Sequence, residues 1–564
     1  MSGIRVALAQ LSPTVGDLNA NKALIVEAIE KAKRHGCDLV VFPELALTGY
    51  PPEDLLNKED FVAQAETVLE ELAESSRDIC VVVGAVVRAE RVNRSLANVR
   101  DARDVGMAKP AALANVAAVL RNACIEQLIP KRLLPNYAVF DEQRWFVPGT
   151  MPGTLVVIGE MKVGVLVCED LWSAEGPASD LARAGADILV SINASPFARG
   201  QQERRETVGA ARTRETGAAL VYVNQVGGQD ELVFDGGSFV MDAEGTIMTR
   251  AKSFVIDTVS VTIENDGSIL GDDLNAIPED LERIYEALVL GTRDYLAKNG
   301  FTKALIGLSG GIDSAIVATI AADAIGAHNV RCIAMPSRYS SDHSLSDAED
   351  LARRLGVSFE TREIEPAHRA YESMLGAALG ARPSGLTDEN LQSRLRGVLL
   401  MGISNATGAI VLTTGNKSEL ATGYSTLYGD SAGGFGVIKD VPKTLVYALC
   451  AYRNQRSLDR GDPAPIPENI LTKAPSAELR PDQRDEDSLP AYEILDPILA
   501  GYIEDDLSVE ALIAQGYDPG TVARVCRLVD IAEYKRRQMP PGPRITSKAF
   551  GKDRRMPITN GFRA

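Results

Sequence analysis

A short polar loop in the second half of the chain has the residue types that bind phosphate. It reads Ser309-Gly310-Gly311-Ile312-Asp313-Ser314 and lies between an apolar run, 303–308, and a helix-like run, 315–325. A strand that ends in Ser-Gly-Gly lets backbone N–H groups and a hydroxyl close around phosphate oxygens, and the helix that follows adds its positive end. We therefore predict that ATP binds here.

Three other interpretations of this loop were weighed against ATP binding. The Gly-x4-Gly-Lys-Ser/Thr spacing of the Walker loop is absent from the chain, which argues against a kinase or motor-type NTPase. Gly307, Ser309 and Gly311 satisfy the nucleophile elbow of an α/β-hydrolase, but that elbow needs a histidine late in the chain. The only histidines are His35, His328, His343 and His368. A purely structural glycine turn would explain Ser-Gly-Gly but not the Asp-Ser that follows it.

Three residues of the first half have the types needed for nucleophilic catalysis. Cys168 follows the apolar run 161–167, Glu44 follows a β-branched run, and Lys131 opens a Lys-Arg-Leu-Leu-Pro segment. Each has an ordinary alternative, since an isolated cysteine is usually a small core residue, and glutamate or lysine is usually solvated. A thiolate needs a neighbouring base or cation to form at neutral pH, and the next histidine after Cys168 is His328. Lysine, glutamate or a helix end must therefore activate the thiol.

Alternating strand-like and helix-like runs place both sets of residues on α/β scaffolds. The β-rich runs of the first half are 5–10, 38–42, 79–87, 162–167, 188–192 and 219–224. A polar, turn-rich segment over 264–278 is typical of a linker, and a helix is predicted over 279–298. From residue 303 a second series of strands and helices predicts a parallel sheet with a nucleotide at the carboxyl ends of its strands. The stretch from Arg88 to Ala112 is charge-rich and weakly periodic, which predicts a solvated insertion.

Composition excludes several classes of protein. The length of 564 residues suggests about two to four domains. No run of about eighteen apolar residues predicts a membrane span, and the N-terminal residues lack the features of a signal peptide, so we place the protein in the cytoplasm. The net charge of −18 argues against a nonspecific nucleic-acid surface. The seven cysteines lie far apart without a Cys-x2-Cys pair, which disfavours structural zinc and a disulfide framework.

The three residues of the first half resemble a known catalytic triad. A strand ending in Pro-Glu44, a later Lys131 and a strand ending in Cys168-Glu-Asp look like the Glu-Lys-Cys triad of the nitrilase superfamily, in its glutaminase branch. The resemblance implies that Glu44 takes the thiol proton, Cys168 attacks the carboxamide of L-glutamine, and Lys131 stabilises the oxyanion. The residues that it implies near the bound glutamine are Tyr137, Ser195 and Gln201. At the last of these positions many members of the family have lysine instead.

The loop of the second half resembles the PP-loop of adenylating synthetases and amidotransferases. Together with the segments 335–344, 413–420, 428–430 and 534–537, it makes nearly the whole chain similar to the glutamine-dependent NAD⁺ synthetase family. The resemblance implies an N-terminal nitrilase-like α-β-β-α sandwich over 1–263, a linker over 264–278, and a C-terminal Rossmann-like PP-loop domain with a parallel sheet over 279–564. It also implies a ligase that amidates deamido-NAD⁺ with ammonia from glutamine. The reaction would pass through an adenylated intermediate and release AMP, pyrophosphate and glutamate.

The same resemblance implies the binding residues of the second half. Those for ATP are Gly307, Leu308, Ser309, Gly310, Gly311, Ile312, Asp313, Ser314, Thr414, Lys443 and Ser476. Those for deamido-NAD⁺ are Asn390, Arg394, Glu419, Tyr534 and Lys535, and Glu419 would join Asp313 at Mg²⁺. Synthetases of this type generally form homo-oligomers. Ammonium is not nucleophilic, so we also hypothesise a dry passage that carries ammonia from Cys168 to the second site.

Two other functions stay open at this point. The first is a non-catalytic module that pairs a nitrilase-like domain with an ATP sensor, although such a protein would have lost a residue of the triad or of the loop. The second is a PP-loop amidotransferase with another acceptor, of the GMP or asparagine synthetase type. Those enzymes resemble glutaminases with a Cys-His-Glu triad or an N-terminal cysteine, whereas this chain has Ser2 after Met1 and no histidine near Cys168.

Overall fold

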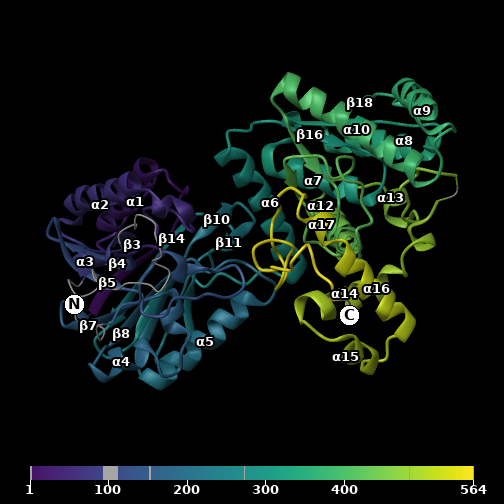
Figure 1. Ribbon diagram of the computed structural model, residues 1–564. Helices are drawn as coiled ribbons and strands as arrows, with labels where there is room; N and C mark the ends of the chain where they lie inside the picture. Colours follow the sequence, from purple (N-terminus) through teal and green to yellow (C-terminus); the bar gives the residue numbers. More distant parts are fainter. Residues whose placement is uncertain (1–2, 93–111, 151–153, 272, 482, 563–564) are drawn as a thin grey trace. The chain divides into compact units, whose positions relative to one another are not determined.

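The structure is a computed structural model that describes residues 3–92, 112–150, 154–271, 273–481 and 483–562. Its contacts divide the chain into two compact units (Figure 1). The first unit comprises Met1–Gln229 and Val233–Pro278, and the second comprises Asp230–Leu232 and Glu279–Ala564.

The first unit contains two large sheets. The seven-stranded sheet has the order β15-β14-β1-β2-β3-β4-β5, with β1 (Gly3–Gln10), β2 (Leu39–Val41), β3 (Cys80–Arg88), β4 (Leu113–Arg121), β5 (Cys124–Pro130), β14 (Asp257–Glu264) and β15 (Ile269–Gly271). The six-stranded sheet has the order β13-β12-β9-β8-β7-β6, with β6 (Leu155–Ile158), β7 (Met161–Val167), β8 (Ile188–Asn193), β9 (Ala219–Asn224), β12 (Phe239–Met241) and β13 (Ile247–Arg250). A separate two-stranded sheet pairs β10 (Val226–Gln229) with β11 (Leu232–Asp235).

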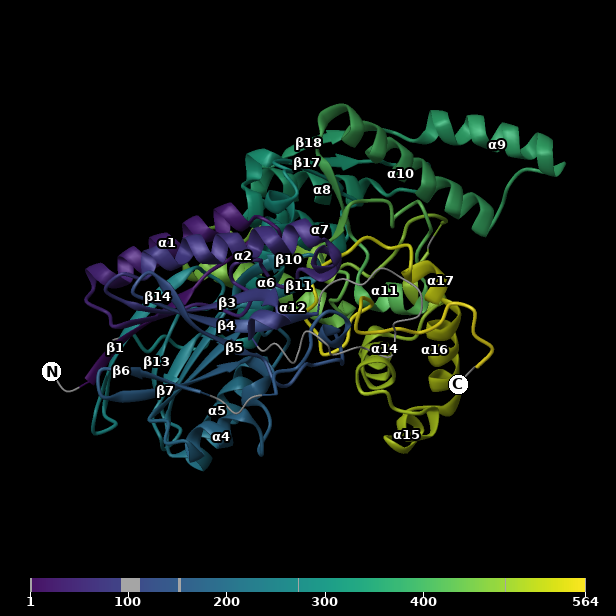
Figure 2. The ribbon, with the colours of Figure 1, turned by 60° about the vertical axis from the view of Figure 1, so that its left-hand side comes forward.

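The two large sheets pack face to face, and helices cover their outer faces (Figure 2). One core between the sheets joins Val82 of β3 to Val165 of β7 and Val190 of β8. The helices α1 (Leu18–Arg34) and α2 (Glu59–Ala73) pack on the larger sheet, and α4 (Pro177–Arg183) and α5 (Gln201–Thr216) lie by the smaller one. The predicted α-β-β-α sandwich is therefore confirmed.

The strands next to the predicted triad are buried on both faces. The sequence of β3, Cys-Val-Val-Val-Gly-Ala-Val-Val-Arg, is buried at every position except its last, as expected for a β-branched run between two layers. β1, β2 and β3 are parallel neighbours, and so are β7, β8 and β9. Glu44 follows β2 and Cys168 follows β7, so each residue lies just past the carboxyl end of a parallel strand.

The second unit is built on a five-stranded parallel sheet. Its order is β18-β17-β16-β19-β20, with β16 (Ala304–Gly307), β17 (Val330–Ala334), β18 (Ser358–Thr361), β19 (Ile410–Thr413) and β20 (Phe435–Gly436). Leu400 of α10 (Leu386–Thr407) packs against Leu305 and Ile333 of the sheet. The helix α7 (Ile312–Ile325), which follows β16, packs against α6 (Asp280–Lys298) and α12 (Lys443–Asp459). The predicted Rossmann-like domain with a parallel sheet is therefore confirmed.

Further helices complete the second unit. A separate apolar core holds α14 (Tyr492–Leu499) and α16 (Pro519–Ile531), together with Leu512 of α15 (Val509–Ala514). The other helices are α8 (Asp342–Leu355), α9 (Glu365–Leu379), α11 (Lys417–Thr422), α13 (Glu468–Thr472) and α17 (Glu533–Arg536). Throughout the described residues, every helix is too short or too polar to cross a membrane.

Two segments differ from the sequence-based expectation. The strand β15 lies inside 264–278, where the sequence predicts a linker, and it pairs antiparallel with β14. Of the predicted insertion from Arg88 to Ala112, Arg88 is the last residue of β3, and Ala89–Val92 form the short helix α3 with Ala89 in the core. Residues 93–111 lie outside the described residues.

Candidate active sites

Glu44 and Lys131 meet in the interior of the first unit. Glu44 lies in the turn after β2, and Lys131 is the residue that follows β5. Lys131 Nζ donates to Glu44 Oε1 at 2.7 Å, and neither side chain is more than 1% exposed. The turn can lie against β3 because Gly84 has no Cβ, which would stand 2.1 Å from the backbone nitrogen of Leu45. The structure therefore brings two of the three predicted catalytic residues into direct contact.

Cys168 is held beside this pair in an uncommon backbone conformation. It follows β7 with a φ of +47°, a region that non-glycine residues rarely occupy outside functional sites. Burial, and then the negative charge of Glu44, raises the pKa of the Cys168 thiol well above its usual range, while Lys131 acts in the opposite direction. The thiol is therefore protonated at rest, and a nearby base must take its proton before it can attack a carbonyl.

The sequence-based reasoning missed Glu142, the second carboxylate on Lys131. Lys131 Nζ donates to Glu142 Oε1 at 2.8 Å, and the Tyr50 hydroxyl donates to the same oxygen at 3.0 Å. Burial raises the pKa of Glu142 to about 7. In the sequence this residue lies in the charged run Asp-Glu-Gln-Arg, which has no feature that separates it from a solvated turn. Its role becomes visible only when the fold buries it.

The three predicted glutamine-binding residues differ in how they are linked to the residues around Cys168. The Tyr137 hydroxyl donates to Glu169, the neighbour of Cys168, at 2.9 Å. Ser195 is buried just after β8, and the preceding residue, Ala194, donates its N–H to Glu44 Oε2 at 3.2 Å. Gln201 is the first residue of α5, and its backbone N–H donates to the Ala198 carbonyl. Tyr137 thus contacts the neighbour of Cys168, and Ser195 follows a residue that contacts Glu44, whereas Gln201 is placed only at the start of α5.

A cavity of about 660 Å³ in the second unit gathers the other predicted residues. It is lined by every predicted residue of that half except Gly310, namely Gly307, Leu308, Ser309, Gly311, Ile312, Asp313, Ser314, Asn390, Arg394, Thr414, Glu419, Lys443, Ser476, Tyr534 and Lys535. Two serine hydroxyls form hydrogen bonds within the loop before α7. The Gly311 N–H donates to Ser309 Oγ at 3.2 Å, and Ser314 Oγ donates to the Gly311 carbonyl at 2.9 Å. Gly310, within this loop, has a φ of +77°.

Two carboxylates and one lysine form the charged centre of this cavity. Lys443 forms an ion pair with Asp313 and lies 3.5 Å from Glu419. Burial, and then the charge of Asp313, raises the pKa of Glu419 to about 8. Burial works against the charge of Lys443, but the two carboxylates outweigh it and raise the pKa of this lysine. Both carboxylates thus contact the ammonium group of Lys443, and their oxygens are of the kind that Mg²⁺ prefers.

The remaining predicted residues lie around the same cavity on other elements. Asn390 and Arg394 are on α10, where the Thr426 hydroxyl donates to Asn390 at 2.8 Å and Arg394 Nε donates to the Leu427 carbonyl at 3.2 Å. Lys535 of α17 donates to two carbonyls of the segment that follows α11, both at 2.7 Å.

Comparison with known proteins relates both sites to one family. The carbon-nitrogen hydrolase family matches residues 5–267, and the NAD synthase family matches residues 284–540. Glutamine-dependent NAD(+) synthetase of Acinetobacter baylyi is 44% identical over 100% of this chain and 99% of its own length. That of Rhodobacter capsulatus is 44% identical over 99% of each chain. The chain belongs to the glutamine-dependent NAD⁺ synthetase family. The solved structure of this family's member from Acinetobacter baumannii, in complex with adenosine diphosphate, is 40% identical over 99% of each chain with a TM-score of 0.77.

Sequence reasoning also missed charged residues on the cavity wall of this glutamine-dependent NAD⁺ synthetase family member. Lys473 Nζ lies 3.0 Å from Glu478 Oε1, and the Ser344 hydroxyl donates to the same oxygen at 2.6 Å. Asp485 accepts from the Tyr492 hydroxyl at 2.8 Å. Lys473 and Glu478 lie on a loop, and Asp485 begins a short 3-10 helix, so no periodic pattern marks them and only the folded cavity reveals them.

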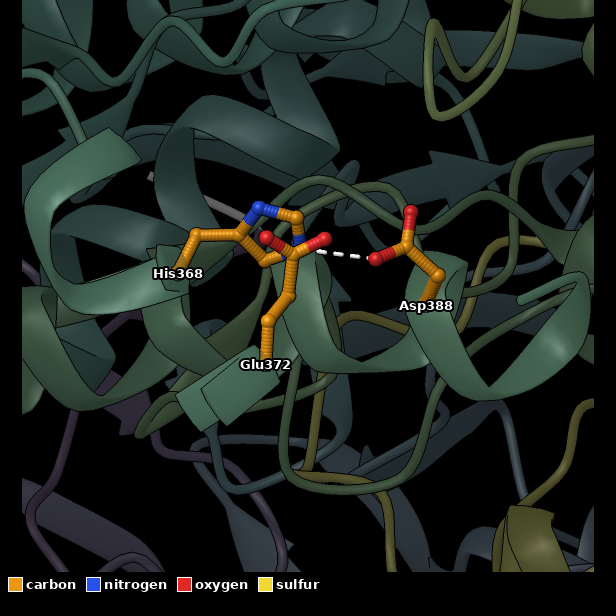
Figure 3. A group of neighbouring side chains, drawn as sticks. All are labelled: His368, Glu372 and Asp388. Atoms are coloured by element: carbon orange, nitrogen blue, oxygen red, sulfur yellow. Dashed lines mark hydrogen bonds and ion pairs between the residues drawn. The ribbon is translucent and has the colours of Figure 1, made fainter. Parts of the chain in front are cut away.

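One further cluster in this synthetase has the residue types of a metal site. His368, Glu372 and Asp388 present ligand atoms within 4.8 Å of one another (Figure 3). His368, which is fully buried, forms a 2.8 Å hydrogen bond with Asp388 through Nε2. Glu372 already pairs with the guanidinium groups of Arg338 at 3.1 Å and Arg382 at 2.7 Å. The two arginines already neutralise the carboxylate that a metal ion would need. We therefore interpret the cluster as a structural contact, in which the His368–Asp388 hydrogen bond joins α9 to α10.

Proposed function

We propose that this protein makes NAD⁺ from deamido-NAD⁺, ATP and L-glutamine. The observation that carries the proposal is that one chain holds two complete sets of chemical groups, each inside a matched family region. A buried Glu44–Lys131 pair lies with Cys168 in the first unit, and a cavity lined by the Ser-Gly-Gly loop lies in the second. The A. baumannii relative solved with ADP supports an adenine nucleotide in that cavity.

In the first unit, we infer that Glu44 accepts the proton of Cys168 as the sulfur attacks the carboxamide carbon of glutamine. Lys131 Nζ, held by two carboxylates, stabilises the negative charge that develops on the carbonyl oxygen. The C–N bond then breaks, and Glu44 returns the proton to the leaving nitrogen, which departs as ammonia. Water, deprotonated by Glu44, attacks the thioester carbon, releases glutamate and restores the thiol.

In the second unit, we infer that the nicotinate carboxylate attacks the α-phosphorus of ATP and that pyrophosphate leaves. Ammonia attacks the resulting acyl adenylate, AMP departs with the C–O bond electrons, and the amide of NAD⁺ remains. Asp313 and Glu419 would hold Mg²⁺, which would neutralise phosphate charge when bound. Lys443 keeps its positive charge beside these carboxylates and orients phosphate oxygens. The Ser309–Ser314 loop contributes backbone donors to the phosphates.

The finer features of the proposal follow from the family resemblance and the chemistry. We place the domain limits at 1–263 and 279–564 and assign glutamine binding to Tyr137, Ser195 and Gln201. We assign deamido-NAD⁺ binding to Asn390, Arg394, Glu419, Tyr534 and Lys535. A dry passage for ammonia would keep it from protonation. We also expect a cytoplasmic homo-oligomer, which light scattering of the purified protein would test.

The test of the proposed function is NAD⁺ formation with either glutamine or ammonium chloride as nitrogen donor. We expect the wild type to use both donors and Cys168→Ala to use only ammonium, because that variant keeps the second site. Cys124→Ala removes an exposed free thiol and serves as the matched control, with both activities retained. If deamido-NAD⁺ gave no NAD⁺ with either donor, the acceptor would be wrong, and other carboxylate acceptors for a PP-loop amidotransferase would have to be considered.

A further inference from the structure

Arg205 is a buried cation that the proposed chemistry does not use. It lies in the first turns of α5 with none of its surface exposed, and it is the largest fully buried side chain among the described residues. A guanidinium in such a place must have its charge and its N–H groups satisfied. Asp235, 4% exposed, supplies the charge, since Arg205 Nη1 donates to its Oδ2 at 2.9 Å.

The other donors of Arg205 converge on the segment after β8. Nη2 donates to the carbonyls of Ser195 at 2.8 Å and Pro196 at 3.0 Å, and Nε donates to the Ser195 hydroxyl oxygen at 3.1 Å. Three of the hydrogen bonds of this guanidinium thus hold two consecutive residues. The planar fork of arginine can satisfy these acceptors at fixed angles, whereas a lysine ammonium cannot.

A second side chain holds the same segment independently of Arg205. The Ser195 N–H donates to Asn224 Oδ1 at 2.9 Å, and Asn224 Nδ2 donates to the Ser195 carbonyl at 3.2 Å. The backbone of Ser195 therefore has two anchors. Its hydroxyl oxygen, in contrast, accepts from Arg205 Nε.

We propose that Arg205 is a positioning residue for the glutamine site, and that it fixes Ser195 as a hydrogen-bond donor toward the bound amino acid. A hydroxyl has one proton and can accept through its lone pairs. Because Ser195 Oγ accepts from the Arg205 N–H, its own proton points away from the guanidinium. The buried Tyr222 hydroxyl also interacts with Ser195, so it competes for this proton with an acceptor oxygen of glutamine. This inference rests on the proposed function, since it takes glutamine as the ligand beside Ser195.

The test compares Arg205→Lys with the wild type in NAD⁺ formation by the full-length protein. Lysine keeps the charge beside Asp235 but loses the donor to Ser195 Oγ. We expect KM for glutamine to rise about tenfold or more with kcat within about threefold, because a binding interaction is lost in the ground state and the transition state alike. The rate with ammonium chloride should stay within about twofold of the wild type.

Arg212→Lys is the matched control. Arg212 is a second buried arginine of α5, and it bonds Glu215 at 2.8 Å rather than the segment that holds Ser195. Its substitution should leave KM for glutamine unchanged. If Arg212→Lys raised this KM as much as Arg205→Lys does, the effect would belong to the helix and the proposal would be overturned.

A double-mutant cycle separates positioning of Ser195 from a structural role. In the Ser195→Ala background, Arg205→Lys should change KM by less than about twofold, because the hydroxyl that it positions is gone. An equal effect in both backgrounds contradicts the proposal, and so does loss of the ammonium-dependent rate in Arg205→Lys, which would show that Arg205 supports the fold. If the wild type made no NAD⁺ from glutamine, the proposed function itself would fail. A wild-type KM in Arg205→Lys would refute only the role of Arg205.

Discussion

At the proposed glutaminase site, one lysine is shared by two buried carboxylates. Lys131 bonds both Glu44 and Glu142, so two negative charges face one positive charge in the interior. Like charges in such surroundings cannot both ionise freely, and the excess is relieved by a proton. Burial raises the pKa of Glu142 to about 7, which makes it the carboxylate that holds this proton below neutral pH.

We predict that Glu142→Gln lowers kcat with glutamine by about tenfold or more, because Lys131 loses one of the two partners that hold it where the oxyanion forms. It should also remove an inflection near pH 7 from the pH profile of the glutamine-dependent rate, because the titrating carboxyl is absent. The measurement is kcat against pH with each donor. The ammonium-dependent profile is the internal control, and a change of the same size in both profiles would count against a role at the triad.

In the second unit, the raised pKa of Glu419 predicts a pH-dependent requirement for Mg²⁺. The proton bound below about pH 8 must leave before the carboxylate can bind a cation. The half-saturating Mg²⁺ concentration should therefore fall as pH rises from about 6.5 to 8.5, the range around that pKa. Titration of the ammonium-dependent rate with MgCl₂ measures it. Glu419→Gln should weaken this dependence, whereas Glu389→Gln, on the same cavity wall, should keep it.

At the scale of elements, the phosphate loop needs a glycine at 310 because of both its conformation and its neighbour. Its φ is +77°, and a Cβ there would lie 2.1 Å from the Ser344 carbonyl oxygen of α8. We predict that Gly310→Ala lowers the ammonium-dependent rate by about a hundredfold, since the loop or α8 must move. Gly311→Ala is the control, because its Cβ would meet only Ser309 Oγ at 3.3 Å. Equal losses in the two variants would contradict this explanation.

The connection between α9 and α10 depends on a buried histidine rather than on a metal. We predict that His368→Ala lowers the free energy of unfolding of this region by about 1–3 kcal/mol, since it opens a cavity and leaves Asp388 without its 2.8 Å partner. Thermal melts without nucleotide measure the change. Arg369→Ala, which removes an exposed ion pair to Glu365, should have little effect. Treatment with EDTA should leave the melting temperature of the wild type unchanged, and a clear drop would favour a bound cation.

Hydrophobic patterns predicted the buried parallel strands at the centre of each large sheet, but few of the strands and helices around them. The expected strands at 188–192 and 219–224 correspond to β8 and β9, because buried β-branched runs have few other stable arrangements. The hairpin of β14 and β15 was missed, since Asn-Asp-Gly between its strands was taken for the start of a linker. Glu142 and Arg205 were missed because charged residues are solvated in most sequences. Only the tertiary fold buries them, Glu142 beside Lys131 and Arg205 beside Asp235.

Over the whole molecule, the proposed function joins two reactions that are useful only together. One unit would release ammonia from glutamine, and the other would activate a carboxylate with ATP to receive it. Sequence motifs located both sets of residues, because the Ser-Gly-Gly loop and the segments that contain Glu44, Lys131 and Cys168 can each be recognised from their own short sequences. The cavity and the hydrogen bonds around Lys131 depend on distant segments, so they required the structure.

The central claim is that the amide nitrogen of glutamine becomes the amide nitrogen of NAD⁺ on this one chain. The most direct measurement is the mass of NAD⁺ formed from deamido-NAD⁺, ATP, Mg²⁺ and glutamine labelled with ¹⁵N at its amide, in the presence of unlabelled ammonium chloride. We expect wild-type NAD⁺ to carry the label well above its share of the free ammonium pool, and Cys168→Ala to give only unlabelled NAD⁺. Labelled ammonia released without labelled NAD⁺, or no NAD⁺ at all, would contradict it.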